Sequence, residues 1–449
     1  MACYGDFYWL IMGLKENGIV KFLRKRFRSS TKFPQWIHRA DHCLSRKNIS
    51  QQALKVLYRL SDAHYDAYLV GGSVRDLLLN RNPKDFDIAT NATPEDVRKL
   101  FRNSRIIGRR FRLVHVYFEK EVVEVSTFRA NSEAEEPQTK ETRGPHKTAL
   151  MITADNTYGT IEEDAWRRDF TVNALYYNIK DFSVVDFTGG LADLKAKKIS
   201  MIGDPLQRFH EDPIRLLRAI RLAAKLDFSI DDSISQLLTP MAYLLEHVPQ
   251  ARLLDEMIKL FFEGYAVITF QRLQDINYVA VLFPELANVL AKPNAEATKK
   301  LVYSALKTTD QRFYNEQRLT PGFLLAVLLW PVLQNFLVEC QQQGMRFSAA
   351  FHLTMQKTVQ TQAEVCLLTK RMLAMMRAVW TLQYHLERRR SRRIYHLLKH
   401  RYFRAAFDLL ALRAEAGEVS LSLVQWWDTF QNAKVKQRHA MLEQLEKKT

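Results

Sequence analysis

Hydrophobic positions divide the chain into a mixed part and a helical part. From about residue 51 to 200, short apolar runs with the two-residue period of strands alternate with runs of helical period. From Asp212 onward nearly every apolar run has the helical period. The pattern therefore predicts an α/β head followed by an all-α region.

Several elements of the head follow from these periods. The run at 51–60 predicts a helix whose apolar stripe consists of Ala53, Val56, Leu57 and Leu60. Short buried strands are predicted at 67–70 and 85–90. The alternating segments 112–118 and 121–128 predict a hairpin around Glu119-Lys120.

A second helix of the head has a clear start signal. Thr93 is a preferred capping residue, and Pro94 suits the first helical position. Glu95 and Asp96 favour the positive end of the helix dipole. Farther along, the polar segment from about 130 to 160 predicts a loop.

The helical region contains long apolar stripes, for example at 214–226, 253–265, 323–330 and 396–416. The chain has 449 residues, which is too many for one core and suits two to four domains. We expect a partly irregular N-terminal extension, a head, a helical neck and a helical body, with boundaries at 1–50, 51–200, 201–265 and 266–449.

The amino-acid composition limits the kinds of molecule that we expect the protein to bind. The formal net charge of +17 favours a polyanion, either nucleic acid or an anionic membrane. Four widely spaced cysteines form no metal or disulfide pattern, which fits a reducing compartment. No apolar run has membrane-spanning length, and the N-terminus does not resemble a signal peptide. The basic stretch at 19–28 is either a helix that touches lipid headgroups or a solvated tail.

The first candidate for chemistry is the pair Asp85 and Asp87. On a strand these two carboxylates share one face, and Phe86 points to the core. Adjacent carboxylates repel each other unless a cation lies between them, and hard oxygen ligands favour Mg²⁺ or Mn²⁺. Two such ions are the usual device for in-line displacement at phosphorus. An exposed strand end or turn is the alternative for a DxD sequence alone.

A Gly-rich junction lies close before this pair. Gly71, Gly72 and Ser73 follow the strand at 67–70 and lead into a helix, so the backbone there can approach a phosphate. Arg75 can then reach the phosphate or the sugar, with Asp76 holding it in place. Alone, the two glycines indicate only a tight turn.

Three further groups of polar residues are candidates. Glu124 lies on a mostly apolar strand and is either a third carboxylate of the metal site or an outward-facing edge residue. Arg167, Arg168 and Asp169 suit a phosphate clamp held by a carboxylate, with a surface ion-pair cluster as the alternative. Asp212 and Arg215 lie three apart on one helix face and can either read a base edge or pair with each other.

Four motifs occur in a fixed order along the chain. They are GGSVRDLLL (71–79), PKDFDIATNATPE (83–95), RRDFTVNALYY (167–177) and EDPIRLLRAIR (211–221). In this order they resemble class II nucleotidyltransferases of the polymerase β superfamily, which include bacterial poly(A) polymerases and CCA-adding enzymes. The likeness covers about residues 40–280. The segments 106–116 and 401–416 are more similar to bacterial poly(A) polymerases.

The resemblance implies a mixed sheet like that of polymerase β, in a bacterial cytoplasmic enzyme that acts on RNA 3′ ends. By position, it implies that Asp85 and Asp87 bind the metal, with Asp169 as an active-site carboxylate. Gly71, Gly72 and Arg75 would hold the nucleotide, and Asp212 and Arg215 fall where the family reads the incoming base.

The leading hypothesis is a template-independent poly(A) polymerase that uses ATP and Mg²⁺. A CCA-adding tRNA nucleotidyltransferase is the first alternative, and a non-catalytic RNA-binding or membrane-tethered protein is the second. The intact motifs argue against the second.

RNA binding is expected mainly from the C-terminal region. Arg389, Arg390, Arg392 and Arg393 could follow a phosphate backbone, or form a solvated helix face. Within the basic stretch from Arg388 to Arg404, the rings of Tyr395, Tyr402 and Phe403 suit stacking on a single strand. The alternative is an amphipathic helix whose rings lie in the core.

Overall fold

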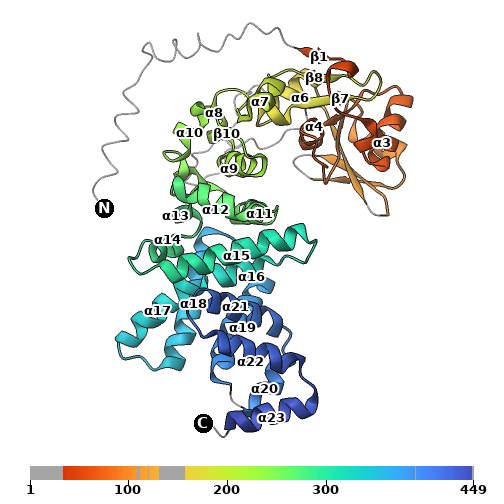
Figure 1. The fold of residues 1–449 in the computed structure, drawn as a ribbon. Helices are drawn as coiled ribbons and strands as arrows, with labels where there is room; N and C mark the ends of the chain where they lie inside the picture. Colours follow the sequence, from red (N-terminus) through yellow and green to blue (C-terminus); the bar gives the residue numbers. More distant parts are fainter. Residues whose placement is uncertain (1–33, 109–111, 120, 131–156, 390, 447–449) are drawn as a thin grey trace, which may run out of the picture. The chain divides into compact units, whose positions relative to one another are not determined.

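The computed structural model describes residues 34–108, 112–119, 121–130, 157–389 and 391–446, without the side chains of 391–393 and 446. Its contacts form two compact units (Figure 1). The first unit holds the described residues up to 130 together with 158–166 and 173–191, and the second holds 167–172 and the residues from 192 onward. The basic stretch at 19–28 and most of the predicted loop lie outside the described residues.

An eight-stranded sheet forms the centre of the first unit. Its order is β1-β8-β7-β2-β3-β6-β5-β4. Within it β3 and β6 pair in parallel, and the other neighbours pair antiparallel. The strands are β1 (Gln35–Ile37), β2 (Ala67–Val70), β3 (Asp87–Thr90), β4 (Ser104–Ile107), β5 (Leu113–Tyr117), β6 (Val122–Thr127), β7 (Leu175–Asn178) and β8 (Val184–Asp186).

Two helices of the first unit begin where the sequence predicts. In α3 (Gln51–Asp62) all four residues of the expected apolar stripe are buried. In α5 (Pro94–Leu100) the Thr93 hydroxyl accepts the Asp96 amide at 3.2 Å, which confirms the predicted cap. The other helices are α4 (Gly72–Leu78) and α6 (Ile161–Arg167), and α7 (Gly190–Ala196) continues into the second unit.

The two faces of the sheet differ. Leu69, Ile88 and Val125 are in register on one face and are fully buried, and α3 contacts β2, β3 and β6. The opposite face carries Val70, whose register partner is Asp87, and an aromatic cluster over which α6 packs. Asp87 and its register partner Glu124 therefore lie on the same face of the sheet as the aromatic cluster.

One predicted strand begins later than expected. We predicted strand 85–90, but β3 begins at Asp87, and Asp85 lies in the preceding irregular segment. The reason is that β2 ends at Val70, the partner of Asp87, because the chain turns at Gly71 into α4. Phe86 is buried, as expected.

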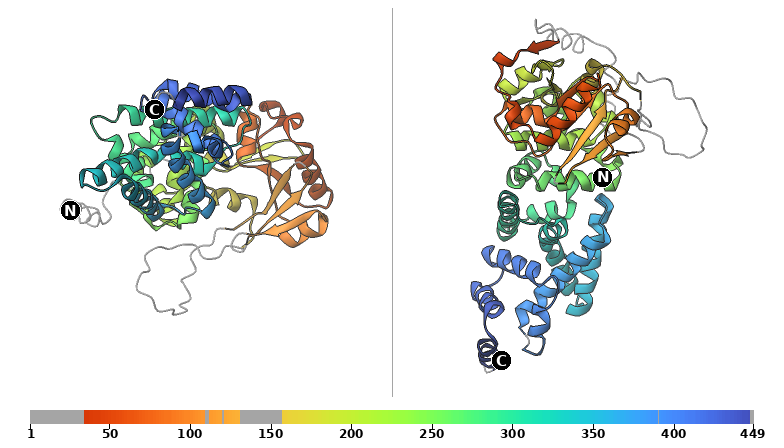
Figure 2. Two further views of the ribbon diagram at one scale, coloured as in Figure 1. Left: turned by 90° about the horizontal axis from the view of Figure 1, so that it is seen from below. Right: turned by 90° about the vertical axis from the view of Figure 1, so that its right-hand side faces the viewer.

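The second unit is helical apart from a short parallel pair, β9 (Lys198–Ile199) and β10 (Ser229–Ile230). Figure 2 shows the green-to-blue part of the chain as a succession of helices. They are α8 (Pro205–Glu211), α9 (Ile214–Leu226), α10 (Asp232–Leu238), α11 (Gln250–Phe261), α12 (Ala266–Asp275), α13 (Tyr278–Leu282), α14 (Pro284–Leu290), α15 (Glu296–Tyr314), α16 (Pro321–Leu328), α17 (Trp330–Gln342), α18 (Phe347–Val365), α19 (Lys370–Arg388), α20 (Ser391–Leu398), α21 (Phe403–Glu415), α22 (Leu421–Asn432) and α23 (Val435–Glu446).

The helical predictions hold for α9 and fail near the C-terminus. Helix α9 has the bounds predicted from its stripe, and nine of its thirteen residues are buried. The run 396–416, predicted as one helix, is instead divided between α20 and α21. The division lets Ile394 and Phe403 enter one apolar core with Trp427 of α22, which a straight helix would not allow.

No single described helix is long and apolar enough to cross a membrane. The pair α16 and α17, bent by 41°, meets the length and composition criteria together. Most residues of α16 are buried within the second unit, as in the core helix of a folded domain.

A buried arginine links α21 to α19, two helices of the apolar core around Trp427. The side chain of Arg413 on α21 is 7% exposed. Its guanidinium donates to Gln383 at 3.0 Å, to Glu387 at 2.6 Å and to Glu418 at 3.0 Å. The guanidinium carbon also lies 4.4 Å from the centre of the Trp330 ring. One residue thereby satisfies polar groups of α19 and of the segment after α21.

We predict that Arg413→Leu lowers the free energy of unfolding by about 3 kcal/mol. The substitution leaves the carboxylates of Glu387 and Glu418 and the buried amide of Gln383 without their partner. Urea denaturation followed by helical circular dichroism measures this change. The control is Arg404→Leu, which removes a largely exposed partner of Asp408 and should cost less than about 1 kcal/mol. Equal losses in the two variants would contradict the role given to Arg413.

Candidate active site

The acidic part of the site lies on β3 and β6. Asp87 and Glu124 are register partners in the parallel pair, so their side chains leave the same face of the sheet. The Glu124 carboxylate also lies 3.5 Å from Nε2 of His115 on β5. Asp85 is exposed just before β3. The structure thus brings Asp87 beside Glu124 and leaves Asp85 two residues away along the chain.

The donor set suits a hard cation that also binds a nucleotide. Among the described residues, no three His, Cys, Asp or Glu side chains are placed to hold a metal ion by themselves. Mg²⁺ is commonly held by one or two carboxylates, with water and substrate phosphates completing its octahedron. Asp85 and Asp87 fit that pattern, and Glu124 remains a predicted third ligand.

The Gly-rich junction adopts the conformation that the sequence predicts. Gly71 has φ 70°, which favours glycine, and its amide donates to the carbonyl of Leu175 at 3.3 Å. A β-carbon on Gly72 would lie 3.4 Å from the guanidinium of Arg75. The Arg75 guanidinium thus lies directly against Gly72, over the start of α4. Ser73 is buried, and its hydroxyl donates to the carbonyl of Val70 at 2.8 Å.

Arg75 is held from two sides. Its side chain is 5% exposed and forms an ion pair with Asp76 at 2.7 Å, as the sequence suggests. Its Nη1 donates to Oδ1 of Asn173 at 2.5 Å. Asn173 lies 98 positions away, so sequence reasoning did not include it. Two partners therefore fix the orientation of the Arg75 guanidinium.

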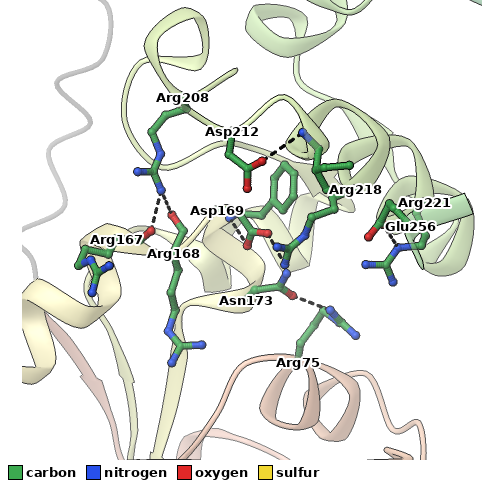
Figure 3. A network of polar contacts seen from close by, with 12 residues as sticks. Arg75, Arg167, Arg168, Asp169, Asn173, Arg208, Asp212, Arg218, Arg221 and Glu256 are labelled. Carbon is green, nitrogen blue, oxygen red and sulfur yellow. Dashed lines mark hydrogen bonds and ion pairs between the residues drawn. The ribbon is translucent and has the colours of Figure 1, made fainter. Parts of the chain in front are cut away.

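The second set of candidates surrounds Asp169 in the second unit (Figure 3). Asp169 is buried, and its Oδ1 accepts the amide of Phe170 at 2.9 Å. Its Oδ2 lies 2.6 Å from Nη2 of Arg218 on α9. The carboxylate raises the pKa of the Arg218 guanidinium. Arg218 lies three positions after Arg215 in the motif 211–221. The sequence analysis does not single it out as a site residue.

Arg208 anchors the backbone of the arginine pair. Its Nη2 donates to the carbonyls of Arg167 and Arg168, both at 2.6 Å (Figure 3). Burial lowers the pKa of the Arg208 guanidinium, and an ion pair with Glu211 at 3.0 Å opposes that effect. The backbone that carries Arg168 is thus fixed by α8, a contact that no local pattern reveals.

The predicted base readers do not pair with each other. The Asp212 carboxylate forms an ion pair with Arg252 of α11 at 2.6 Å. Nη1 of Arg215 donates instead to the carbonyl of Arg208 at 2.7 Å and to Glu211 at 3.0 Å. Asp212 is the C-cap residue of α8, and its Oδ1 also accepts the amide of Ile214, the first residue of α9, at 3.3 Å. Asp212 therefore lies at the Pro213 junction just before α9, where its carbonyl accepts the amide of Arg215 at 3.1 Å, and the base-reading role of the two side chains remains a prediction.

The predicted RNA-binding arginines are only partly described. Arg390 lies outside the described residues, and so do the side chains of Arg392 and Arg393. Arg389 ends α19 in the left-handed conformation, with φ 42° and its guanidinium carbon 5.4 Å from the centre of the Trp426 ring.

The rings expected to stack on RNA lie in an apolar core or pack against it. Phe403 belongs to the apolar core, 5.7 Å from Trp427 between ring centres, and Tyr395 packs against the same core. The stacking role predicted for Phe403 is wrong, because its ring is buried.

Comparisons with known proteins agree with the fold and the motifs. Residues 67–200 match the poly A polymerase head domain, residues 227–290 the probable RNA and SrmB-binding site of polymerase A, and residues 343–449 the polymerase A arginine-rich C-terminus. The crystal structure of the Bacillus stearothermophilus CCA-adding enzyme in complex with CTP has the same fold. Its TM-score is 0.54 at 24% identity, with 84% of this chain and 81% of that chain covered.

Two relatives define the family. The chain is 44% identical over 414 residues to poly(A) polymerase I of Salmonella typhi, which covers 91% of this chain and 88% of that protein. It is 37% identical over 220 residues to the CCA-adding enzyme of Lactobacillus helveticus, which covers 49% and 52%. The expected α/β head and helical region are also confirmed. The chain therefore belongs to the bacterial poly(A) polymerase family, whose members are enzymes that add nucleotides to RNA.

Proposed function

We propose that this chain is a template-independent poly(A) polymerase that transfers AMP from ATP to RNA 3′ ends by two-metal catalysis. The observation that carries the proposal is the extent of the likeness. The alignment with poly(A) polymerase I covers 91% of the chain at 44% identity, whereas the alignment with the CCA-adding enzyme covers 49% at 37% identity. The helical region beyond the head and neck thus follows the poly(A) polymerase pattern.

The reaction is a displacement at the α-phosphorus of ATP. The RNA 3′-oxygen forms a bond to that phosphorus and loses its proton, while the bond to the bridging oxygen breaks and pyrophosphate leaves. Bound Mg²⁺ or Mn²⁺ would make the hydroxyl more acidic and neutralise the leaving pyrophosphate. Asp85 and Asp87 would hold these ions, with Glu124 as the third carboxylate.

The residues around the Gly-rich junction support the triphosphate. Gly71, Gly72 and Ser73 let the backbone approach a phosphate, and Arg75 is already oriented by Asp76 and Asn173. A guanidinium fixed in this way loses little conformational freedom when it binds an anion. Arg168 is proposed as a second phosphate ligand, with Asp169 and Arg208 fixing its segment of backbone.

Asp212 and Arg215 are the proposed base readers. Both contacts of Arg215 use Nη1, so Nη2 and Nε can still donate to a base edge. Asp212 is oriented by Arg252 and presents carboxylate oxygens that accept an amino group. On this view residues 51–200 supply the chemistry, 201–265 read the base, and 266–449 hold the RNA.

We predict that Asp85→Asn and Asp87→Asn each lower the rate of AMP addition at least 100-fold, because loss of a metal ligand costs several kcal/mol. Single-turnover extension of a labelled RNA measures the rate, and circular dichroism checks the fold. Asp66→Asn is the control, since Asp66 is an exposed carboxylate of the same unit paired with Lys180. Retention of more than about a tenth of the rate in both variants would exclude the two-metal assignment.

We predict that ATP is used at least 100-fold better than CTP, UTP or GTP, because two polar readers can reject a base that leaves them unpaired. The assay offers each labelled nucleotide separately, with Mg²⁺, to an unstructured RNA and to a tRNA lacking its CCA end. Comparable addition of CTP and ATP to the truncated tRNA would favour the CCA-adding alternative. No addition to either RNA would favour a non-catalytic RNA-binding protein.

A further inference from the structure

Three aromatic rings stack at the contact of α18 with α19 in the second unit. The ring centres of Phe347 and Tyr384 are 4.6 Å apart, with 20° between their planes. Those of Phe347 and Phe351 are 5.7 Å apart at 10°. All three side chains are half-buried rather than enclosed. The rings thus form a nearly parallel platform with part of its surface open to solvent.

A cation accompanies the platform. The guanidinium carbon of Arg388 lies 4.1 Å from the centre of the Tyr384 ring and 5.9 Å from that of Phe347. Arg388 is exposed, as is Arg346 immediately before Phe347. Aromatic rings interleaved with arginines are the arrangement by which proteins bind single-stranded nucleic acid without reading its sequence.

A groove of about 550 Å³ lies beside the platform, between α19 and α20. Arg377, Thr381 and Arg388 are spaced along one stripe of α19 with Tyr384. His385, which lines the groove, lies 5.5 Å from Tyr384 between ring centres. The described lining residues also include His396 and His400, and none of them is acidic. The groove therefore combines one guanidinium and three imidazole rings with a largely apolar floor, and Arg377 is the charged lining group that can pair with a phosphate there.

We infer that the α18–α19 platform and this groove bind single-stranded RNA, with a base stacked on the rings and the neighbouring phosphates in the groove. The inference rests on the proposed function, which requires a surface that holds many RNA sequences. A base has a ring face whatever its identity, so stacking meets that requirement where hydrogen-bond readout would not. The platform also supplies the stacking surface that the buried Phe403 cannot.

The test compares a ring variant with a charge variant. We predict that Phe347→Leu with Tyr384→Leu weakens binding of a short fluorescein-labelled oligoadenylate at least about fivefold, with an unchanged salt slope, because stacking releases no counterions. Tyr384→Phe keeps the ring and should retain affinity. Arg388→Gln should instead reduce the salt slope by about one. Fluorescence anisotropy, without ATP or metal, measures the RNA affinity of these three variants and of the wild-type chain.

Two controls separate recognition from folding. Trp36→Leu removes an exposed ring of the first unit, outside the proposed RNA-binding surfaces, and should leave affinity unchanged. An abasic oligomer of the same length should bind wild-type protein more weakly and show no further loss with the ring variant. If the ring variant fails to fold, photocrosslinking of 5-iodouridine RNA to the wild-type chain should label Tyr384 or Phe347.

Wild-type affinity in a folded ring variant, or equal losses for the intact and abasic oligomers, would overturn the inference. Binding of anionic vesicles in place of RNA would also overturn it. Because the assay contains no nucleotide, it is independent of catalysis. A chain that binds RNA through these rings but adds no AMP would contradict only the proposed polymerase function.

Discussion

The parallel pairing of β3 with β6 is the constraint on which the acidic site depends. It is the one parallel contact in the described eight-stranded sheet, and its register sets Asp87 beside Glu124. Like charges directly opposite each other destabilise a sheet. Nε2 of His115, which is in register with Glu124 on the next strand, lies 3.5 Å from the Glu124 carboxylate. A cation bound there, as proposed above, would reduce that repulsion.

The arginines of the second unit serve a different purpose from the one suggested by their positive charge. Arg208, Arg218 and Arg413 are directed at backbone carbonyls or carboxylates within the unit. They fix the geometry of segments that carry functional residues. Three of the cations behind the net charge of +17 are therefore engaged within the unit, whereas Arg388 is exposed.

Sequence reasoning predicted the elements whose causes are local. The cap at Thr93, the stripe of α3 and the whole of α9 depend on residues a few positions apart. It missed Asn173 and Arg252, whose partners lie 98 and 40 positions away. It left open whether the rings of Tyr395, Tyr402 and Phe403 stack on RNA or lie in the core, because an amphipathic stripe does not show which face packs on α22. The structure buries Phe403 and packs Tyr395 and Tyr402 against the core. The half-exposed rings of Phe347 and Tyr384 come together only through the contact of two helices.

The central claim is that Asp85 and Asp87 act through a divalent ion bound to the nucleotide. The most direct measurement is AMP addition from the two diastereomers of ATP that carry sulfur at the α-phosphate, in Mg²⁺ and then with added Mn²⁺ or Cd²⁺. The account predicts that one diastereomer reacts much more slowly in Mg²⁺, because sulfur is a poor ligand for that hard ion, and that the softer ion restores its rate. Equal rates for both diastereomers in Mg²⁺ would contradict it.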